Sequence, residues 1–146
     1  MTIQSMLDEG RLIRREWSGH DDDGRQLLCL YTALMNDPDA RPETCPATVC
    51  PRWLAFLLPW INDVGTAEHW PEVVRRVARL APRLAALGPE VEWRVRARII
   101  AAKAAAAATE ATATAAATTV AAYTAAKAAT ADRIIDAILD VVAEAP

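Results

Sequence analysis

Apolar side chains recur at helical spacing along most of the chain, and this pattern predicts a mainly α-helical protein. A helix is expected to begin near Pro51, because Trp53, Leu57 and Trp60 fall at i, i+4 and i+7 and share one face. Pro59 lacks an amide hydrogen, so this helix is expected to end or kink at that position.

A second helix is expected from Pro71 to Leu87, with Gly88 as its stop and a bend at Pro82. Its predicted buried side consists of Val73, Val74, Val77, Leu80, Leu84 and Leu87. Large aromatic residues are concentrated in these two segments. They predict a compact N-terminal unit, residues 1–88, built around Trp53, Phe56, Trp60 and Trp70.

The first 35 residues contain shorter elements. Thr2 to Glu9 is typical of a short helix with Thr2 as its N-cap. Residues 18–24 have the composition of a turn, so the apolar runs on either side, within residues 11–31, are two short strands or two helical pieces. We favour a short hairpin that leads into a helix. The aspartates of the turn resemble a calcium loop only superficially, because the spaced ligands and the closing glutamate are missing.

The stretch from Ala101 to Ala131 contains 19 alanines and seven threonines among its 31 residues, with no glycine or proline. Alanine is the best helix former, so a long helix is expected. It is expected to start at Pro89 and to carry one apolar stripe at Val91, Val95, Ile99 and Ala102. Such a helix has few bulky side chains, and it can pack only by close backbone approach.

Strong amphipathicity returns after the alanine tract. The expected apolar face consists of Ile134, Ile135, Ile138, Leu139, Val141 and Val142. Asp132, Arg133, Asp136 and Asp140 are expected to remain in water. A single helix from Pro89 to Ala143 would be about 80 Å long, far longer than an 88-residue globule is wide. Residues 89–146 are therefore expected either to break near Thr130 and fold back, or to project and pair with another chain.

Charge is unevenly distributed along the chain, although the net charge is only −3. Residues 67–103 carry eight basic and four acidic side chains, whereas the segments on both sides are acidic. Within this region Arg75, Arg79 and Arg83 share one helix face, and Arg94 and Arg98 form a second pair. Such an array suits a phosphate backbone and is the basis of a nucleic-acid-binding alternative. The competing interpretation is a solvated face with local ion pairs such as Glu72–Arg76 and Glu90–Arg94.

Three cysteines, Cys29, Cys45 and Cys50, are present in a chain whose start does not resemble a signal peptide, and reduced thiols in the cytosol are expected. A metal site made of these cysteines is a weaker alternative, because four residues separate Cys45 from Cys50 where two are usual. No cofactor is expected. A membrane-spanning role for the alanine tract is rejected because Lys103, Glu110 and Lys127 would be buried in lipid.

Several short runs resemble one group of proteins. They are MTIQSMLDEGRL at residues 1–12, Cys45–Pro46 with PRWLA at 51–55, PWIND at 59–63, and the helix that contains HWP at 69–71. In these runs residues 1–88 resemble small uncharacterised proteins of phages and prophages in alphaproteobacteria. The alanine-rich end separately resembles the tails of proteins described as immunity proteins. The first resemblance implies a phage-encoded accessory protein, and it brings no catalytic residues.

The function expected from the sequence is therefore non-enzymatic. The chain is expected to act in the host-cell cytosol by binding a protein partner or by self-association, through Ile134, Ile135, Ile138, Leu139 and Val142. No pairing of serine, cysteine, histidine and aspartate suggests a nucleophilic site, and there is no glycine-rich phosphate loop. The alternatives are nucleic-acid binding through the five arginines and an antitoxin-like immunity function.

Overall fold

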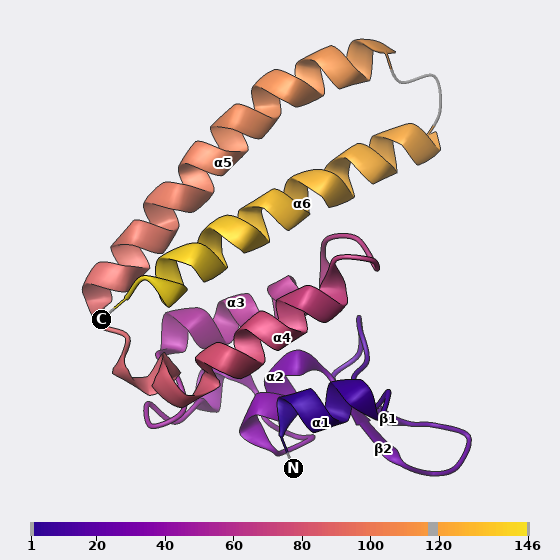
Figure 1. Cartoon of the computed structure of the whole chain (residues 1–146), viewed down its shortest axis with the longest axis vertical. Helices are drawn as coiled ribbons and strands as arrows, with labels where there is room; N and C mark the ends of the chain where they lie inside the picture. The colour runs from indigo at the N-terminus through magenta and orange to yellow at the C-terminus, as the bar shows by residue number, and fades with distance from the viewer. Residues whose placement is uncertain (1, 117–119, 146) are drawn as a thin grey trace.

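The computed structural model describes residues 2–116 and 120–145, without the side chains of 108–116. It confirms a mainly α-helical fold with one small two-stranded hairpin (Figure 1). The elements in chain order are α1 (Ile3–Asp8), β1 (Ser18–His20), β2 (Gln26–Leu28), α2 (Leu30–Met35), the 3-10 helix η1 (Pro42–Thr44), α3 (Arg52–Asp63), α4 (Trp70–Leu80), the 3-10 helix η2 (Ala81–Ala86), α5 (Pro89–Ala116) and α6 (Val120–Ala143).

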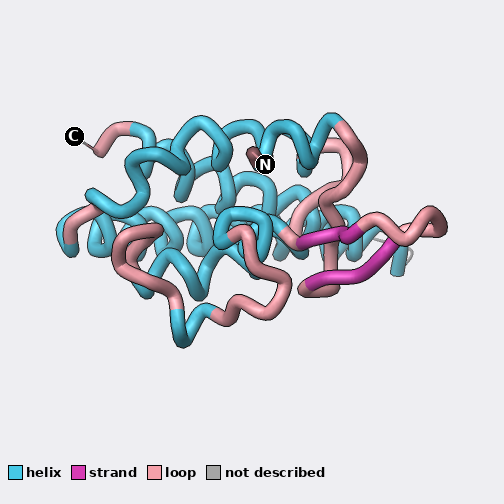
Figure 2. Tube along the Cα trace, turned by 90° about the horizontal axis from the view of Figure 1, so that it is seen from below, coloured by secondary structure: helices cyan, strands magenta, loops and turns pink. Residues whose placement is uncertain are grey.

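The predicted hairpin is confirmed, and it lies at one end of the helical body (Figure 2). β1 and β2 pair antiparallel, with Ser18 opposite Leu28 and His20 opposite Gln26. The Asp21 carboxylate closes the turn by accepting the backbone N–H of Asp23 at 3.0 Å and of Arg25 at 2.8 Å. This use of Asp21 supports a turn in place of a calcium loop.

Helix α3 turns a different face to the core than the sequence pattern predicted. Its buried stripe is aliphatic and runs through Leu54, Leu58 and Ile61, whereas Trp60 is 36% exposed and Phe56 is 47% exposed. Both stripes have the spacing i, i+4 and i+7 and lie about 100° apart on the helix, so periodicity alone cannot choose between them. The predicted aromatic core is therefore wrong at Phe56 and Trp60, whereas Trp53 and Trp70 are half-buried and pack against the core. The helix also continues through Pro59 to Asp63 instead of ending there.

The second predicted helix divides near its proline. α4 ends at Leu80, and a 3-10 segment that contains Pro82 continues to Ala86, which accounts for the predicted bend. The predicted buried side is confirmed at all six of its positions, which are Val73, Val74, Val77, Leu80, Leu84 and Leu87. α4 lies between the N-terminal helices and α6 (Figure 1).

α5 and α6 form a long antiparallel helical hairpin, and α6 lies against α4 (Figure 1). α5 ends at Ala116 and α6 begins at Val120, so Thr130 lies inside α6 and the predicted break near Thr130 is wrong in position. Residues 117–119 lie outside the described residues. The fold-back itself agrees with the first of the two expected outcomes.

The apolar face of α6 is part of the chain's own core. Ile134, Ile135, Ile138, Leu139, Val141 and Val142 are each at most 5% exposed and belong to the same hydrophobic cluster as Leu54, Val73 and Val95. The prediction that this face is an interaction surface is therefore wrong, because the helix that carries it folds back onto α4 and α5. The start of α5 agrees with the predicted boundary at residue 89, but one hydrophobic core crosses that boundary.

The polar side of α6 also attaches the helix to the N-terminal unit, although its aspartates were expected to be solvated. Asp132 accepts hydrogen bonds from the backbone N–H and the hydroxyl of Thr66, at 3.0 and 2.8 Å. The neighbouring Gly65 has φ +80° and lies so close to the Asp132 carboxylate that a side chain would collide with it. Glycine is therefore required for this contact.

A second group of contacts connects the same side of α6 to α4. The Arg76 guanidinium, whose side chain is 18% exposed, donates to Asp136 at 2.8 Å and to Asp140 at 2.6 Å. His69 Nε2 lies 3.0 Å from the same Asp136 carboxylate. Opposite charges on two helices that are far apart in sequence thus fix how α6 lies along α4.

Candidate interaction surface

Helix α5 carries two apolar stripes on opposite sides. One stripe, through Val91, Val95, Ile99, Ala102 and Ala106, faces the core; Val91, Val95 and Ala106 are buried, and Ile99 and Ala102 are half-buried. The other stripe has the spacing i, i+4, i+7, i+11 and i+14 and is exposed throughout; it consists of Trp93, Ala97, Ile100, Ala104 and Ala107. We call this second set the outward stripe.

Two large side chains make the outward stripe unusual. Trp93 is 73% exposed and Ile100 is 68% exposed, and both lie on the side of α5 that faces away from the core. Single exposed apolar residues are common on protein surfaces, but Trp93 and Ile100 lie seven residues, about two helical turns, apart, and with Ala97 between them they form one apolar surface. The helical spacing of residues 93, 97, 100 and 104 is visible in the sequence. It was not recognised as a second stripe because the stripe through Val91 has a helical spacing too.

A groove runs beside this surface, where α3 faces α5. Its volume is about 350 Å³, and its lining consists of Trp53, Phe56 and Leu57 from α3 and Glu92, Val95, Arg96 and Ile99 from α5. Glu92 and Arg96 form an ion pair of 2.6 Å at its edge. Trp53 and Phe56, two of the four aromatic residues that were predicted to form the core, thus line an open groove that adjoins the outward stripe.

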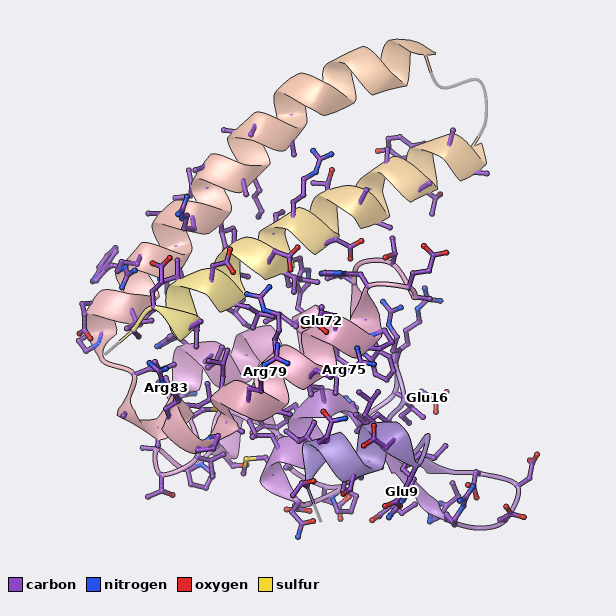
Figure 3. The ribbon with its side chains drawn as sticks, viewed as in Figure 1. Glu9, Glu16, Glu72, Arg75, Arg79 and Arg83 are labelled. Carbon is purple, nitrogen blue, oxygen red and sulfur yellow. The ribbon has the colours of Figure 1, made fainter. Side chains whose placement is uncertain are left out.

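The predicted arginine array is largely engaged by acceptors of the chain itself. Arg75 and Arg79 both bind Glu72, at 3.3 and 3.1 Å, and Figure 3 shows them in a row along α4, with Arg83 farther along the chain in η2. The guanidinium of Arg83 donates to the backbone oxygen of Ala145.

The second arginine pair is divided. Arg94 forms an ion pair of 2.7 Å with Glu144, whereas Arg98 is exposed and has no ion pair among the described residues. The partners differ from the predicted local ones, since Glu72 binds Arg75 and Arg79 in place of Arg76. Arg75, Arg79 and Arg94 are thus each paired with a carboxylate of the chain, which reduces the net positive charge that would attract a phosphate backbone.

Only two of the three cysteines come together. Cys45 and Cys50 have their Sγ atoms 3.5 Å apart, whereas Cys29 lies at the start of α2, where its sulfur accepts the backbone N–H of Thr32. No cluster of three or more histidine, cysteine, aspartate or glutamate side chains suited to a metal ion occurs among the described residues. The alternative metal site of Cys29, Cys45 and Cys50 is therefore not assembled.

A buried polar cluster was missed by the sequence analysis. Asn62, which is fully buried, accepts the backbone N–H of Leu30 and donates to the backbone oxygen of Ile13. Arg14 donates to four consecutive backbone oxygens, those of residues 62–65, at 2.9 to 3.1 Å. Burial lowers the pKa of Arg14 from its ordinary value, with a further contribution from the nearby charge of Arg15. These contacts close the end of α3 and hold residues 13–14 and the start of α2 against it, which is a structural role.

The chain matches no protein-family model, no curated protein and no solved structure. Among the described residues, no helix has both the length and the apolar character needed to cross a membrane.

Proposed function

We propose that this protein is a non-enzymatic interaction protein that self-associates through the outward stripe of α5. The observation that carries the proposal is the exposure of Trp93 and Ile100 on one face of a helix whose opposite face is already buried in the core. This replaces the α6 face expected from the sequence, and it keeps the expectation that the C-terminal region mediates association.

A second copy of the chain fits this surface because the stripe is self-complementary. Large and small residues alternate along it, so a bulky side chain of one copy can occupy the space above an alanine of the other. In an antiparallel pair centred on Ile100, Trp93 of each copy would lie against Ala104 and Ala107 of its partner. Tryptophan is the residue most often found at the energetic centre of protein interfaces.

The test is the solution mass measured by size-exclusion chromatography with light scattering over a wide dilution series. We expect a dimer, with twice the chain mass of 15.8 kDa. Ile100→Asp should shift the protein to a monomer, because it places a charge in the centre of the contact. Val120→Asp is the matched control, since Val120 is 84% exposed and lies outside the stripe, and this variant should remain dimeric. A monomeric wild type, or a dimer that Ile100→Asp leaves intact, contradicts the proposal.

The other functions suggested by the sequence stay predictions. A phage accessory role and an immunity function rest on the sequence resemblances. The structure supports nucleic-acid binding less than the sequence does, because each of four arginines has an acceptor within the chain. These arginines are Arg75, Arg79, Arg83 and Arg94. A gel-shift titration at low salt tests it, and absence of binding under those conditions would end this alternative.

A further inference from the structure

Two thiols face each other in the loop before α3. The Sγ atoms of Cys45 and Cys50 lie 3.5 Å apart, in van der Waals contact, and Cys45 Sγ also donates to the backbone oxygen of Cys50 at 3.7 Å. Cys50 is completely buried, whereas Cys45 is half-buried and reaches the surface. Neither residue takes part in the proposed association surface.

The local sequence explains why the thiols meet. Pro46 begins a turn in which the backbone N–H of Val49 donates to the Pro46 oxygen at 2.9 Å, and the N–H of Cys50 reaches the same oxygen at 3.4 Å. This turn reverses the chain between the two cysteines, and Pro51 is then the N-cap of α3. The spacing that was unfavourable for a metal site therefore suits a pair of facing sulfurs.

We propose that Cys45 and Cys50 are a reversible redox pair that forms an intramolecular disulfide when it meets a low-molecular-weight disulfide such as oxidised glutathione. The thiolate of Cys45 attacks the small disulfide, which forms a mixed disulfide on Cys45 and releases one small thiolate. The Cys50 sulfur then attacks the Cys45 sulfur, which forms the Cys45–Cys50 bond and releases the second small thiolate. Two protein thiols are oxidised, one small disulfide is reduced to two thiols, and the protein thiol protons pass to the released thiolates.

Exposure sets the order of these steps. The oxidant can reach the half-buried Cys45 but not Cys50, so the mixed disulfide forms on Cys45 and Cys50 resolves it. Burial and the hydrogen bond with Cys45 raise the pKa of Cys50 to about 12, so Cys50 is protonated at neutral pH and is not the thiol that attacks the small disulfide first. Cys29 is 3% exposed and is separated from both, so it is expected to remain a thiol.

The experiment uses the full-length protein, equilibrated with oxidised and reduced glutathione and then denatured in an alkylating reagent. Intact mass gives the number of free thiols, and peptide mapping gives their positions. We expect three alkylated thiols in the reduced protein and one, at Cys29, in the oxidised protein. Cys29→Ser is the matched control and should still form the Cys45–Cys50 link. Cys50→Ala should stop at the mixed disulfide on Cys45, which shows the order of the steps.

Three results would overturn the inference. The first is that all three thiols of the wild type stay free in the oxidising buffer. The second is that the disulfide involves Cys29, and the third is that the main product is a disulfide between two chains. The wild-type thiol count needs no variant, so the test does not depend on how well Cys50→Ala folds. Its outcome is also separate from the oligomeric state, because a monomeric protein can form the same intramolecular bond.

Discussion

Ile138→Ala tests whether the apolar face of α6 belongs to the core of its own chain. Ile138 is fully buried, and its neighbours on that face, Ile135 and Leu139, are at most 2% exposed. Shortening a buried isoleucine to alanine removes apolar contacts and leaves a cavity, and such changes cost about 2–5 kcal/mol. A loss of about 3 kcal/mol is a large share of the roughly 5–15 kcal/mol that stabilises a typical domain.

Urea unfolding followed by tryptophan fluorescence measures this loss. With a denaturant slope of about 2 kcal/mol per molar urea, the midpoint should fall by about 1.5 M. Val120→Ala is the control: Val120 is 84% exposed, so the free energy of unfolding should change by no more than about 0.5 kcal/mol. An unchanged midpoint for Ile138→Ala, together with a change in solution mass, would refute the reasoning and make this face a contact between chains.

Three further changes probe the polar contacts and the thiol pair. Arg76→Ala removes the ion pairs to Asp136 and Asp140 and should lower the free energy of unfolding by about 1 kcal/mol in dilute buffer and by less in high salt, measured by urea unfolding at both salt concentrations. The hydrogen bond from Arg79, followed by that from Arg75, lowers the pKa of Glu72 below its ordinary 4.5. The stabilisation from Glu72 is therefore complete above that value and is lost as the pH falls through the lowered pKa. In thermal melts over a range of acidic pH, the melting temperature of Glu72→Gln should fall less with decreasing pH than that of the wild type. The same pH dependence in both proteins would contradict this prediction. Oxidising Cys45 and Cys50 closes a short loop and should raise the free energy of unfolding by roughly 2 kcal/mol, an increase that reductant reverses and that Cys45→Ser should not show.

Local features of the chain were predictable to the extent that neighbouring residues determine them. Thr2 is the N-cap of α1, as predicted, and the structure shows that it caps the helix through a reciprocal pair of hydrogen bonds with Ser5. Pro89 starts α5, and the helix that contains Pro82 changes to 3-10 geometry at that proline. Each of these depends on backbone groups a few residues apart, so the sequence carries the information directly.

The candidate surface was less predictable. Periodicity predicted that Val91 and Val95 lie on the core side of α5, and this is confirmed, whereas the stripe through Trp93 and Ile100 was not predicted. Trp93 and Ile100 matter because they are exposed, and a local sequence pattern does not give the exposure of a side chain. The contact between Cys45 and Cys50 likewise depends on a turn whose geometry a spacing rule does not give.

The sequence by itself determined which residues share a helix face, because the helical repeat fixes those relations whatever surrounds the helix. The tertiary structure alone decided what each face meets. α3 buries Leu58 and leaves Phe56 exposed, and α6 buries Ile138 in its own chain, because the surfaces opposite them come from segments far away in the sequence. Burial is a property of two surfaces, and a periodic pattern describes only one of them.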